Sequence, residues 1–518
     1  MNSREKVIVL DFGGQYNQLI ARRVRESGVY CEVKPYTMPV DEIRKANPIG
    51  IIFTGGPQSV YLENSPKVDA EIFELGIPIL GICYGCQLIS QLLGGNVVPA
   101  GDDNAREYGK TLTYLNPDCV IFGGIPENSI TWMSHGDYME KAPDGFVNVG
   151  RSAVCPNAAI ANAEKKIYAL QFHPEVNHTE YGKEIIKNFL FKVCNATGNW
   201  NMEDFAKTTI ERLKNEIGEK SRILLALSGG VDSAVLAALL SKVVGKRLTC
   251  VFVDHGLMRE NEGNEIEETF RNWDINFVRV NAEKRFLDKL ENIEDPQEKR
   301  HIIGAEFGYV FCDEAEKFGI TDNDYLAQGT IYPDVIESGE GDAEVIKSHH
   351  NKLLPPEVLA RFKGIVEPLD LLFKDEVREL GRKLGLPDNI VNRQPFPGPG
   401  LAIRIIGSVS KERADMLRKA DYIMREEIKN AGEDKNINQY FAVLTNLHSV
   451  GVMGDGRTYD YTLALRAVTT TDFMTADFAR IPYDLLDRIS NRIVNEVKGI
   501  NRIVYDITSK PPATVEWE

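Results

Sequence analysis

The stretch Ile223-Leu-Leu-Ala-Leu-Ser-Gly-Gly-Val-Asp-Ser233, followed by the apolar run 234–240, decides the fold of the middle of this chain. A short apolar segment leads into a Gly-Gly turn, and the Ala/Leu/Val pattern after it is helical for about three turns. Unpaired N–H groups at a helix start bind anions, and glycines let a phosphate approach the backbone closely. We therefore predict a strand, a phosphate-binding loop and a helix.

This loop differs from a Walker loop, in which a lysine follows the second glycine. Val231 and Asp232 stand there instead, so transfer of a γ-phosphoryl group is not expected. The loop resembles the pyrophosphate loop of the N-type ATP pyrophosphatases, in which pyrophosphate leaves and AMP is transferred. A tight strand-to-helix turn with a serine-rich cap is the alternative. The ATP-binding residues that the resemblance implies are Ser228, Gly229, Gly230, Val231, Asp232 and Ser233.

Length and composition indicate a multidomain globular protein. The chain has 518 residues, which is too many for one hydrophobic core and predicts about three domains. We place them at residues 1–198, 199–393 and 394–518. The expected fold class is α/β, with two parallel-sheet α/β domains followed by a small C-terminal α+β domain.

Charge and hydropathy argue against several function classes. The apolar stretches are strand-sized, so no membrane span is expected. Residues 1–6 lead into a strand without the apolar segment of a signal peptide, so we expect a cytoplasmic location. The formal net charge of −16 argues against a nucleic-acid partner, which needs a basic surface. The eight scattered cysteines are expected to be reduced thiols.

The first hundred residues repeat a pattern of strand, turn and helix. Apolar runs at 7–10, 49–53 and 77–82 each end in a glycine-rich turn, and helices are expected over 16–26 and 86–93. This order predicts a parallel sheet whose loops gather at the carboxyl ends of the strands, where sites form.

A nucleophile is predicted in the turn Gly81-Ile-Cys-Tyr-Gly85. This spacing is that of a nucleophile elbow, in which two glycines allow a sharp turn that exposes the central side chain, here Cys83. The helix start behind it favours a thiolate. Cys83 and Cys86 also form a C-x-x-C pair, which leaves a redox pair or half a zinc site as alternatives. Zinc is disfavoured because the chain has no second C-x-x-C.

A thiol nucleophile needs a base and a group that orients the base. The stretch Ala169-Leu-Gln-Phe-His-Pro-Glu175 supplies both, because alternation along an extended segment places His173 and Glu175 on the same side. Since these residues share a domain with the elbow, catalysis is preferred over a structural histidine.

The elbow, the His-Pro-Glu motif and Gly55-Gly-Pro57 together resemble the class I glutamine amidotransferases. The resemblance implies a triad of Cys83, His173 and Glu175 that hydrolyses glutamine through a thioester and releases ammonia. It also implies an oxyanion site formed by the backbone N–H groups of Tyr84 and Gly56. A further matching stretch contains His135, which we expect to be a core or interface residue.

The middle domain offers further candidates for the ATP site. Lys374 is a candidate cation for the pyrophosphate, with an exposed surface charge as the alternative. Residues 346–351 read Ile-Lys-Ser-His-His-Asn. The two adjacent histidines would point to opposite faces of a strand, so they are not expected to share a metal ion. We therefore prefer a phosphate-contacting loop for this segment. ATP chemistry of this kind implies Mg²⁺, for which Asp232 is the nearest carboxylate. A ribose or adenine is expected near Asp254-His-Gly256.

The C-terminal third begins with a stiff boundary, Arg393-Gln-Pro-Phe-Pro-Gly-Pro-Gly400, which excludes a helix or a central strand. A helix over 411–430 and a strand leading into 450–457 are expected next. A helix over 483–497 and a strand over 502–506 follow. The tail 510–518 contains two prolines and a tryptophan and is expected to be docked.

The order of all these motifs resembles the glutamine-hydrolysing GMP synthetase family over essentially the whole chain. The resemblance implies that ATP adenylates xanthosine monophosphate (XMP) at its C2 oxygen with release of pyrophosphate. Ammonia from glutamine then displaces AMP to give GMP. It also implies a homodimer formed by the C-terminal domain. The implied XMP contacts are Arg300, Gln439, Asp455, Lys510 and Glu516.

One departure and three alternatives remain. The family usually has a Gly-Gly pair after His-His-Asn, whereas this chain reads Lys352-Leu-Leu-Pro-Pro356, which leaves the motion of this segment open. Another amidotransferase-coupled adenylating ligase is disfavoured by the C-terminal motifs. A tRNA-thiolating transferase would need a basic surface, which the net charge opposes. A catalytically silent regulator is disfavoured by the intact triad.

Overall fold

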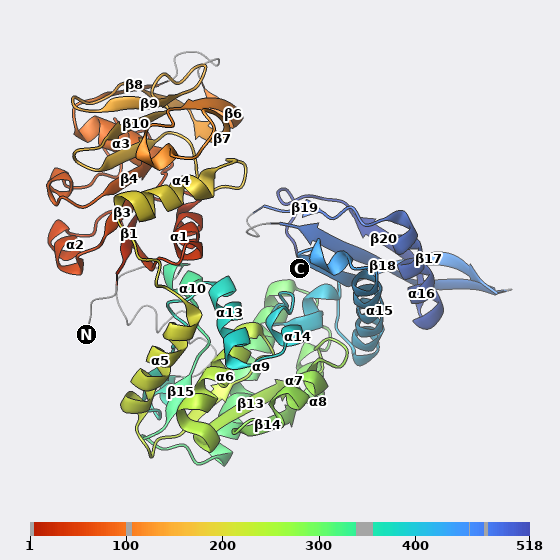
Figure 1. Ribbon diagram of the computed structural model, residues 1–518. Coiled ribbons are helices and arrows are strands. Elements are labelled where there is room, and N and C mark those ends of the chain that lie inside the picture. The colour runs from red at the N-terminus through yellow and green to blue at the C-terminus, as the bar shows by residue number, and fades with distance from the viewer. Residues whose placement is uncertain (1–4, 100–105, 338–355, 455, 471–474) are drawn as a thin grey trace. The chain divides into compact units, whose positions relative to one another are not determined.

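The computed structural model describes residues 5–99, 106–337, 356–454, 456–470 and 475–518. The chain divides into two compact units, unit 1 up to Phe205 and unit 2 from Ala206 onward. Figure 1 colours unit 1 from red to yellow and most of unit 2 from green to blue. The predicted boundary at residue 198 lies close to the border between the units. The one at 393 lies inside unit 2, so the three-domain division stays a prediction.

A nine-stranded sheet forms the centre of unit 1. Its strands, in spatial order, are β2 (Cys31–Pro35), β1 (Val7–Asp11), β3 (Gly50–Phe53), β4 (Ile79–Ile82), β11 (Ile167–Leu170), β10 (Ala159–Asn162), β9 (Val147–Arg151), β6 (Glu107–Leu115) and β7 (Asn128–His135). The first five run parallel, as predicted, and β1, β3, β4 and β11 are almost wholly buried, which explains their unbroken apolar sequences. The other four pair antiparallel and were not predicted. Strand β7, for example, alternates exposed and buried side chains.

Four α-helices and a small two-stranded sheet also belong to the described part of unit 1. They are α1 (Asn17–Glu26), α2 (Val40–Ala46), α3 (Tyr84–Leu92) and α4 (Gly182–Asn188), with β5 (Asn96–Pro99) paired to β8 (Asp137–Lys141). Helix α3 begins two residues before the predicted start at 86, because Cys83 itself is its N-cap. Phe12 packs against Phe53 and Tyr84, with ring centroids 5.5 Å apart in both pairs, beneath this turn.

A five-stranded parallel sheet forms the first half of unit 2, in the order β14 (Asn276–Asn281), β13 (Leu248–Asp254), β12 (Ile223–Ala226), β15 (Tyr325–Ala327) and β16 (Gly364–Val366). The central strand β12 leads into the predicted loop and then into α6 (Val231–Val244). Helix α6 is buried on nearly all sides, as its almost wholly apolar sequence requires. The phosphate-binding loop is therefore anchored at both ends in the core.

The other helices of this half surround the sheet. They are α5 (Met202–Ile217), which crosses the border between the units, α7 (Glu262–Phe270), α8 (Glu283–Leu290), α9 (Pro296–Lys317), α10 (Tyr332–Glu337), α12 (Pro356–Leu359), α13 (Lys374–Leu384) and α14 (Asp388–Val391). The Pro/Gly run after α14 forms no strand and no α-helix, as predicted.

The C-terminal half of unit 2 is a sheet with two helices packed on it (Figure 1). Strand β18 (Gly456–Thr469) pairs antiparallel with β17 (Gln439–Met453) and β19 (Asp477–Phe478) and parallel with β20 (Ile500–Asp506). The helices are α15 (Lys411–Asn430) and α16 (Tyr483–Glu496). Leu224 and Val251 of the first half share one hydrophobic core with Leu417 and Leu444 of this half. This common core explains why the two halves form one unit.

The tail 510–518 is docked, which confirms the prediction. Three fully buried cationic side chains hold it. Arg466 donates to the carbonyl oxygens of Thr508 and Thr514, Arg404 makes a bidentate pair with Glu516, and Lys299 Nζ lies 2.6 Å from Glu518 Oε2. Buried cations need such partners, so these contacts fix the tail to unit 2 although its own residues stay partly exposed.

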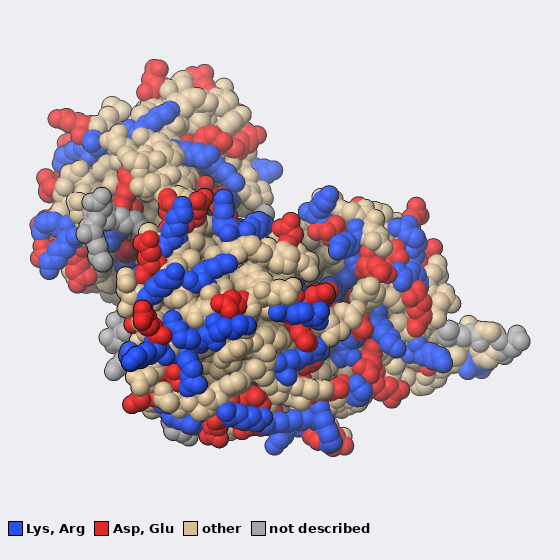
Figure 2. Space-filling model, turned by 60° about the horizontal axis from the view of Figure 1, so that its bottom comes forward, with Lys and Arg blue, Asp and Glu red and all other residues tan. Residues whose placement is uncertain are grey.

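Charged side chains of both signs cover the surface. In the view of Figure 2, Lys and Arg lie interspersed with Asp and Glu and do not gather into a basic face. None of the helices in the described part of the chain has the length and apolar composition of a membrane span.

The N-cap of α9 provides a stability test. Asp295 Oδ1 accepts hydrogen bonds from the backbone N–H groups of Gln297 and Glu298 at 3.0 and 2.8 Å. The change Asp295→Ala is expected to lower the free energy of unfolding of unit 2 by about 1 kcal/mol, because two helix-start donors lose their acceptor. The control Asp295→Asn keeps an acceptor and should lose less. Urea-induced unfolding followed by circular dichroism measures both, and equal stability of all three proteins would contradict the assignment.

Candidate active sites

Cys83 lies in the sharp turn between β4 and α3. Its φ is +53°, in the left-handed region that residues other than glycine rarely adopt. The two flanking positions must be glycine, because a side chain would clash at either one. A Cβ on Gly81 would lie 2.7 Å from the Gly85 backbone oxygen, and a Cβ on Gly85 would lie 2.6 Å from the Phe53 backbone oxygen. A strained central residue between two obligatory glycines is the geometry of a nucleophile elbow.

The structure brings the three predicted triad residues together. His173 follows β11, and its Nδ1 lies 2.6 Å from Oε1 of the fully buried Glu175. Burial alone would lower the pKa of His173, but the charges of Glu175 and Cys83 and the hydrogen bonds to both side chains raise this pKa well above its usual value. An imidazolium beside a thiol favours the thiolate, which is the reactive form of cysteine.

A cavity of about 390 Å³ opens over this group, and we call it the Cys83 cavity. Gly56 and Tyr84, the predicted oxyanion residues, line it together with Cys83 and His173. The ring of Tyr16 packs edge-on against His173 with centroids 5.3 Å apart, which fixes the imidazole plane from the other side. A cavity of this size suits a small-molecule substrate.

Cys86 and His135, two other residues considered in the sequence, are both buried in unit 1. Cys86 is fully buried, and burial raises its pKa well above the usual value, so it stays a neutral thiol and is a poor redox partner for Cys83. His135 is buried as expected, with its Nε2 3.3 Å from Glu107 Oε2. It also lines the Cys83 cavity, so it is more than a distant core residue.

Two glutamines at this site were not predicted from the sequence. Gln171 Nε2 lies 3.9 Å from Cys83 Sγ, and Gln87 Nε2 lies 3.2 Å from Gln171 Oε1. Both side chains are buried. A signal was present, because Gln171 precedes His173 by two residues and alternation places it on the same side of the strand end.

The phosphate-binding loop of unit 2 is ordered by its own serines. The hydroxyls of Ser228 and Ser233 lie 3.1 Å apart, and Ser233 Oγ donates to the Gly230 oxygen at 3.1 Å. Gly229 has φ +82°, and a Cβ there would lie 2.9 Å from Ile266 Cδ1, so this position requires glycine. The loop lines a cavity of about 460 Å³, which we call the phosphate-loop cavity.

Lys374 reaches the loop from the start of α13, as predicted. Its Nζ lies 2.6 Å from Asp232 Oδ2, and both residues line the phosphate-loop cavity. The other carboxylate oxygen, Asp232 Oδ1, is buried and has no hydrogen-bond partner among the described residues. His255 also lines this cavity, and burial lowers its pKa to about 4, so it is neutral at physiological pH.

The predicted XMP contacts fall into two places. Arg300 of α9 lines the phosphate-loop cavity, and its Nη2 donates to the backbone oxygen of Glu518 at 2.6 Å. Gln439 Nε2 donates to Glu516 Oε1 at 2.9 Å, and neither residue is among those that line that cavity. Lys510 pairs through its backbone with Ala476.

Other predicted positions lie outside the described residues. These are Asp455 and the segment 346–355, which includes His349 and His350.

Three protein families match successive parts of the chain. Residues 8–193 match Glutamine amidotransferase class-I, residues 202–300 match PP-loop domain, and residues 426–517 match GMP synthase C terminal domain. The first range contains the Cys83 cavity residues of unit 1, and the second contains the phosphate-binding loop.

Curated relatives match over the full length. A glutamine-hydrolyzing GMP synthase of Finegoldia magna is 62% identical over 512 residues, which cover 99% of each chain. Proteins of the same name from Acetivibrio thermocellus and Treponema denticola are 61% identical over 517 residues and 58% identical over 518 residues. The first covers 100% of both chains, and the second covers 100% of this chain and 98% of the relative. This chain belongs to the family of glutamine-hydrolysing GMP synthases.

Proposed function

We propose that this chain catalyses glutamine-dependent synthesis of GMP from XMP and ATP. The observation that carries the proposal is the presence of two sites of different chemistry in one chain. The group of Cys83, His173 and Glu175 in unit 1 suits release of ammonia from glutamine. The phosphate-loop cavity of unit 2, which has no Walker lysine, suits ATP with pyrophosphate as the leaving group. The full-length similarity to GMP synthases supports the combination.

In unit 1, Cys83 Sγ attacks the side-chain amide carbon of glutamine. His173 gives a proton to the departing ammonia and later accepts one from the water that cleaves the thioester to glutamate. Glu175 binds Nδ1 of His173, which leaves the other ring nitrogen for the thiol and substrate. The backbone N–H groups of Gly56 and Tyr84 are the proposed oxyanion donors.

In unit 2, the C2 oxygen of XMP attacks the α-phosphorus of ATP, and pyrophosphate leaves on the phosphate-binding loop. Ammonia then attacks C2 and displaces AMP, which gives GMP. Lys374 is paired with Asp232 in the structure, so binding of pyrophosphate requires Lys374 to exchange a carboxylate for phosphate oxygens. The net reaction converts ATP, XMP, glutamine and water into GMP, AMP, pyrophosphate and glutamate.

The five XMP contacts belong to the same proposal. Arg300 is the one that lines the phosphate-loop cavity, which suits a nucleotide bound beside ATP. Arg404 and Gln439 hold the Glu516 carboxylate in one orientation. A hydrogen-bond acceptor that is fixed in this way can recognise a nucleotide specifically. Asp455 and Lys510 complete the proposed set.

Mg²⁺ is proposed as the companion of ATP and pyrophosphate. Asp232 fits this role, since its Oδ1 is buried without a hydrogen-bond partner among the described residues. Magnesium prefers carboxylate and phosphate oxygens and usually binds few protein ligands. The bound ion would neutralise charge on the phosphate oxygens.

A homodimer through the C-terminal half of unit 2 is also proposed. Val450 and Val452 on β17 are 60% and 75% exposed, and Tyr459, which pairs with Val450 across the hairpin, is 69% exposed. Alternation places these three side chains on the same face. Exposed apolar side chains gathered on one face mark protein interfaces, and a second copy of this chain is the proposed occupant.

A cytoplasmic location belongs to the same proposal. All eight cysteines of the chain are free thiols, which agrees with a reducing compartment.

The first test separates the two sites. The change Cys83→Ala is expected to abolish GMP formation with glutamine and to leave formation with ammonium at alkaline pH within about two-fold of wild type, because only unit 1 loses its nucleophile. The measurement is GMP formed from XMP and ATP, and Cys119→Ala is the control. A folded Cys83→Ala protein that uses neither nitrogen source would show that this assignment is wrong.

The second test concerns the His173 pKa. The change Glu175→Gln removes a charge that raises this pKa, so His173 should lose its proton at lower pH. Alkylation of Cys83 by iodoacetamide at pH 7 is then expected to slow by about ten-fold or more, because an imidazolium favours the thiolate. Mass spectrometry measures the rate, and the exposed Glu164→Gln is the control. Equal rates in Glu175→Gln and wild type would exclude control by Glu175.

The third test concerns the dimer. The change Val450→Asp is expected to weaken self-association by about ten-fold or more, because it places a charge in the proposed apolar interface. Light scattering over a range of protein concentrations measures the association. Val147→Asp makes the same change at an exposed strand position of unit 1 and should leave the association unchanged. A monomeric wild type would refute the dimer.

A further inference from the structure

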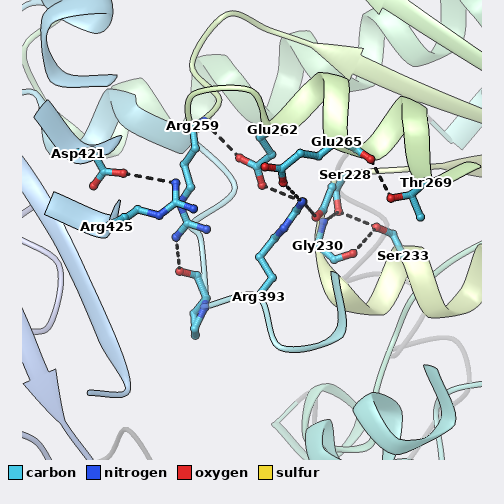
Figure 3. Close-up of polar contacts among 12 residues, drawn as sticks. Ser228, Gly230, Ser233, Arg259, Glu262, Glu265, Thr269, Arg393, Asp421 and Arg425 are labelled. Atoms are coloured by element: carbon cyan, nitrogen blue, oxygen red, sulfur yellow. Dashed lines mark hydrogen bonds and ion pairs between the residues drawn. The ribbon is translucent and has the colours of Figure 1, made fainter. Parts of the chain in front are cut away.

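The guanidinium of Arg393 lies against the phosphate-binding loop (Figure 3). Its Nη1 donates to the Gly229 carbonyl oxygen at 3.1 Å and to Glu262 Oε1 at 3.2 Å, and its Nη2 donates to Glu265 Oε2 at 2.8 Å. The side chain is only 8% exposed and lines the phosphate-loop cavity. In the sequence, Arg393 is the first residue of the Pro/Gly run, and this contact was not predicted.

The contact with Gly229 fixes a peptide group that faces the expected anion. A peptide is planar, with C=O and N–H pointing in opposite directions. By holding the Gly229 carbonyl on one side, Arg393 therefore directs the Gly230 N–H to the other side, where it donates a long hydrogen bond of 3.4 Å to Ser228 Oγ. Gly229 has φ +82° and no Cβ, so this peptide has little intrinsic preference for one orientation. Backbone N–H groups in such loops bind the anion, so their direction affects affinity.

Arg393 and Lys374 differ in how strongly neighbouring carboxylates neutralise their charge. Glu262 and Glu265 both neutralise the Arg393 guanidinium, and Glu262 is buried. Moving Arg393 onto a phosphate would leave the buried Glu262 carboxylate without this cation, which is costly. Lys374, in contrast, forms an ion pair with Asp232 and is more exposed, so it is the better cation for direct contact.

The Glu262 carboxylate also connects the phosphate-binding loop to the Pro/Gly run. The backbone N–H of Arg259 donates to Glu262 Oε2 at 3.2 Å, and Arg259 Nη2 donates to the Pro395 oxygen at 3.1 Å. The Arg259 guanidinium also lies 4.3 Å from the centroid of the Phe396 ring. Figure 3 shows Arg259, Glu262 and Arg393 as one connected group. The segment that carries Arg393 is thus held rigidly beside the loop.

We propose that Arg393 is a positioning residue for the pyrophosphate. It does not contact the phosphate but holds the Gly229–Gly230 peptide in the orientation in which the N–H group can exchange its long contact with Ser228 Oγ for the anion. The proposal rests on the proposed ATP site of unit 2 and adds a residue to it that acts through the backbone.

The change Glu265→Gln distinguishes positioning from direct contact by the sign of its effect. If Arg393 positions the loop, loss of one carboxylate loosens the guanidinium, and binding of magnesium pyrophosphate is expected to weaken by about three- to ten-fold. If Arg393 contacts phosphate directly, the same change frees its charge and strengthens binding. Glu265 is exposed, so folding should be preserved. Isothermal titration calorimetry with magnesium pyrophosphate measures the affinity.

Glu268→Gln is the matched control, because Glu268 is exposed on the same helix α7 and the substitution makes the same change in net charge. Arg393→Ala is expected to weaken pyrophosphate binding by about ten-fold or more, and Arg393→Lys should recover part of the loss through one hydrogen bond to Gly229. With ammonium as the nitrogen source, the KM for ATP should rise in the same order.

Two results would overturn the positioning role. One is pyrophosphate affinity in Glu265→Gln equal to or higher than in Glu268→Gln, and the other is unchanged affinity in Arg393→Ala. A wild type that binds pyrophosphate but forms no GMP would contradict the proposed reaction and not the role of Arg393.

Discussion

Close approach of the backbone at the carboxyl ends of parallel strands is the constraint on which both sites depend. In unit 1, Gly81 and Gly85 leave no room for a Cβ, and this lets Cys83 stand in a left-handed turn above the sheet. In unit 2, the constraint at Gly229 is its φ of +82°, together with the Ile266 side chain that a Cβ would meet at 2.9 Å, and this turn brings the loop backbone to the cavity. The glycine-containing turn of unit 1 exposes the Cys83 side chain, and the glycine-containing turn of unit 2 exposes backbone N–H groups.

Pairs of buried charged groups fix the positions of side chains in both units. Glu175 beside His173 raises the histidine pKa, so that one buried carboxylate orients the base and maintains its charge. In unit 2, the cations Lys299, Arg404 and Arg466 are fully buried, and each has one of its partners in the tail. Removing one member of such a pair is costly, so these contacts specify one arrangement of the tail.

The arrangement of unit 2 links ATP chemistry to the C-terminal half. The phosphate-loop cavity is lined by the loop itself, by Arg300 of α9 and by the Pro/Gly run that begins at Arg393. Arg300 also contacts the tail at Glu518, and both halves share one hydrophobic core. A nucleotide bound beside the loop would therefore be surrounded by elements from both halves of one compact unit.

The sequence by itself determined the elements whose signal is local. The Cys83 elbow, the His-Pro-Glu motif and the Ser228–Ser233 loop each carry their geometry in the order of glycines and apolar residues, so they could be predicted together with their parallel strands. The tertiary structure alone decided contacts between distant segments, including Arg393 on Gly229, Lys299 on Glu518 and Gln171 beside Cys83. The same holds for the antiparallel half of the first sheet and for the hydrophobic core that the two halves of unit 2 share. The physical reason is that burial and charge pairing depend on which surfaces meet, and composition or periodicity within one segment does not record this.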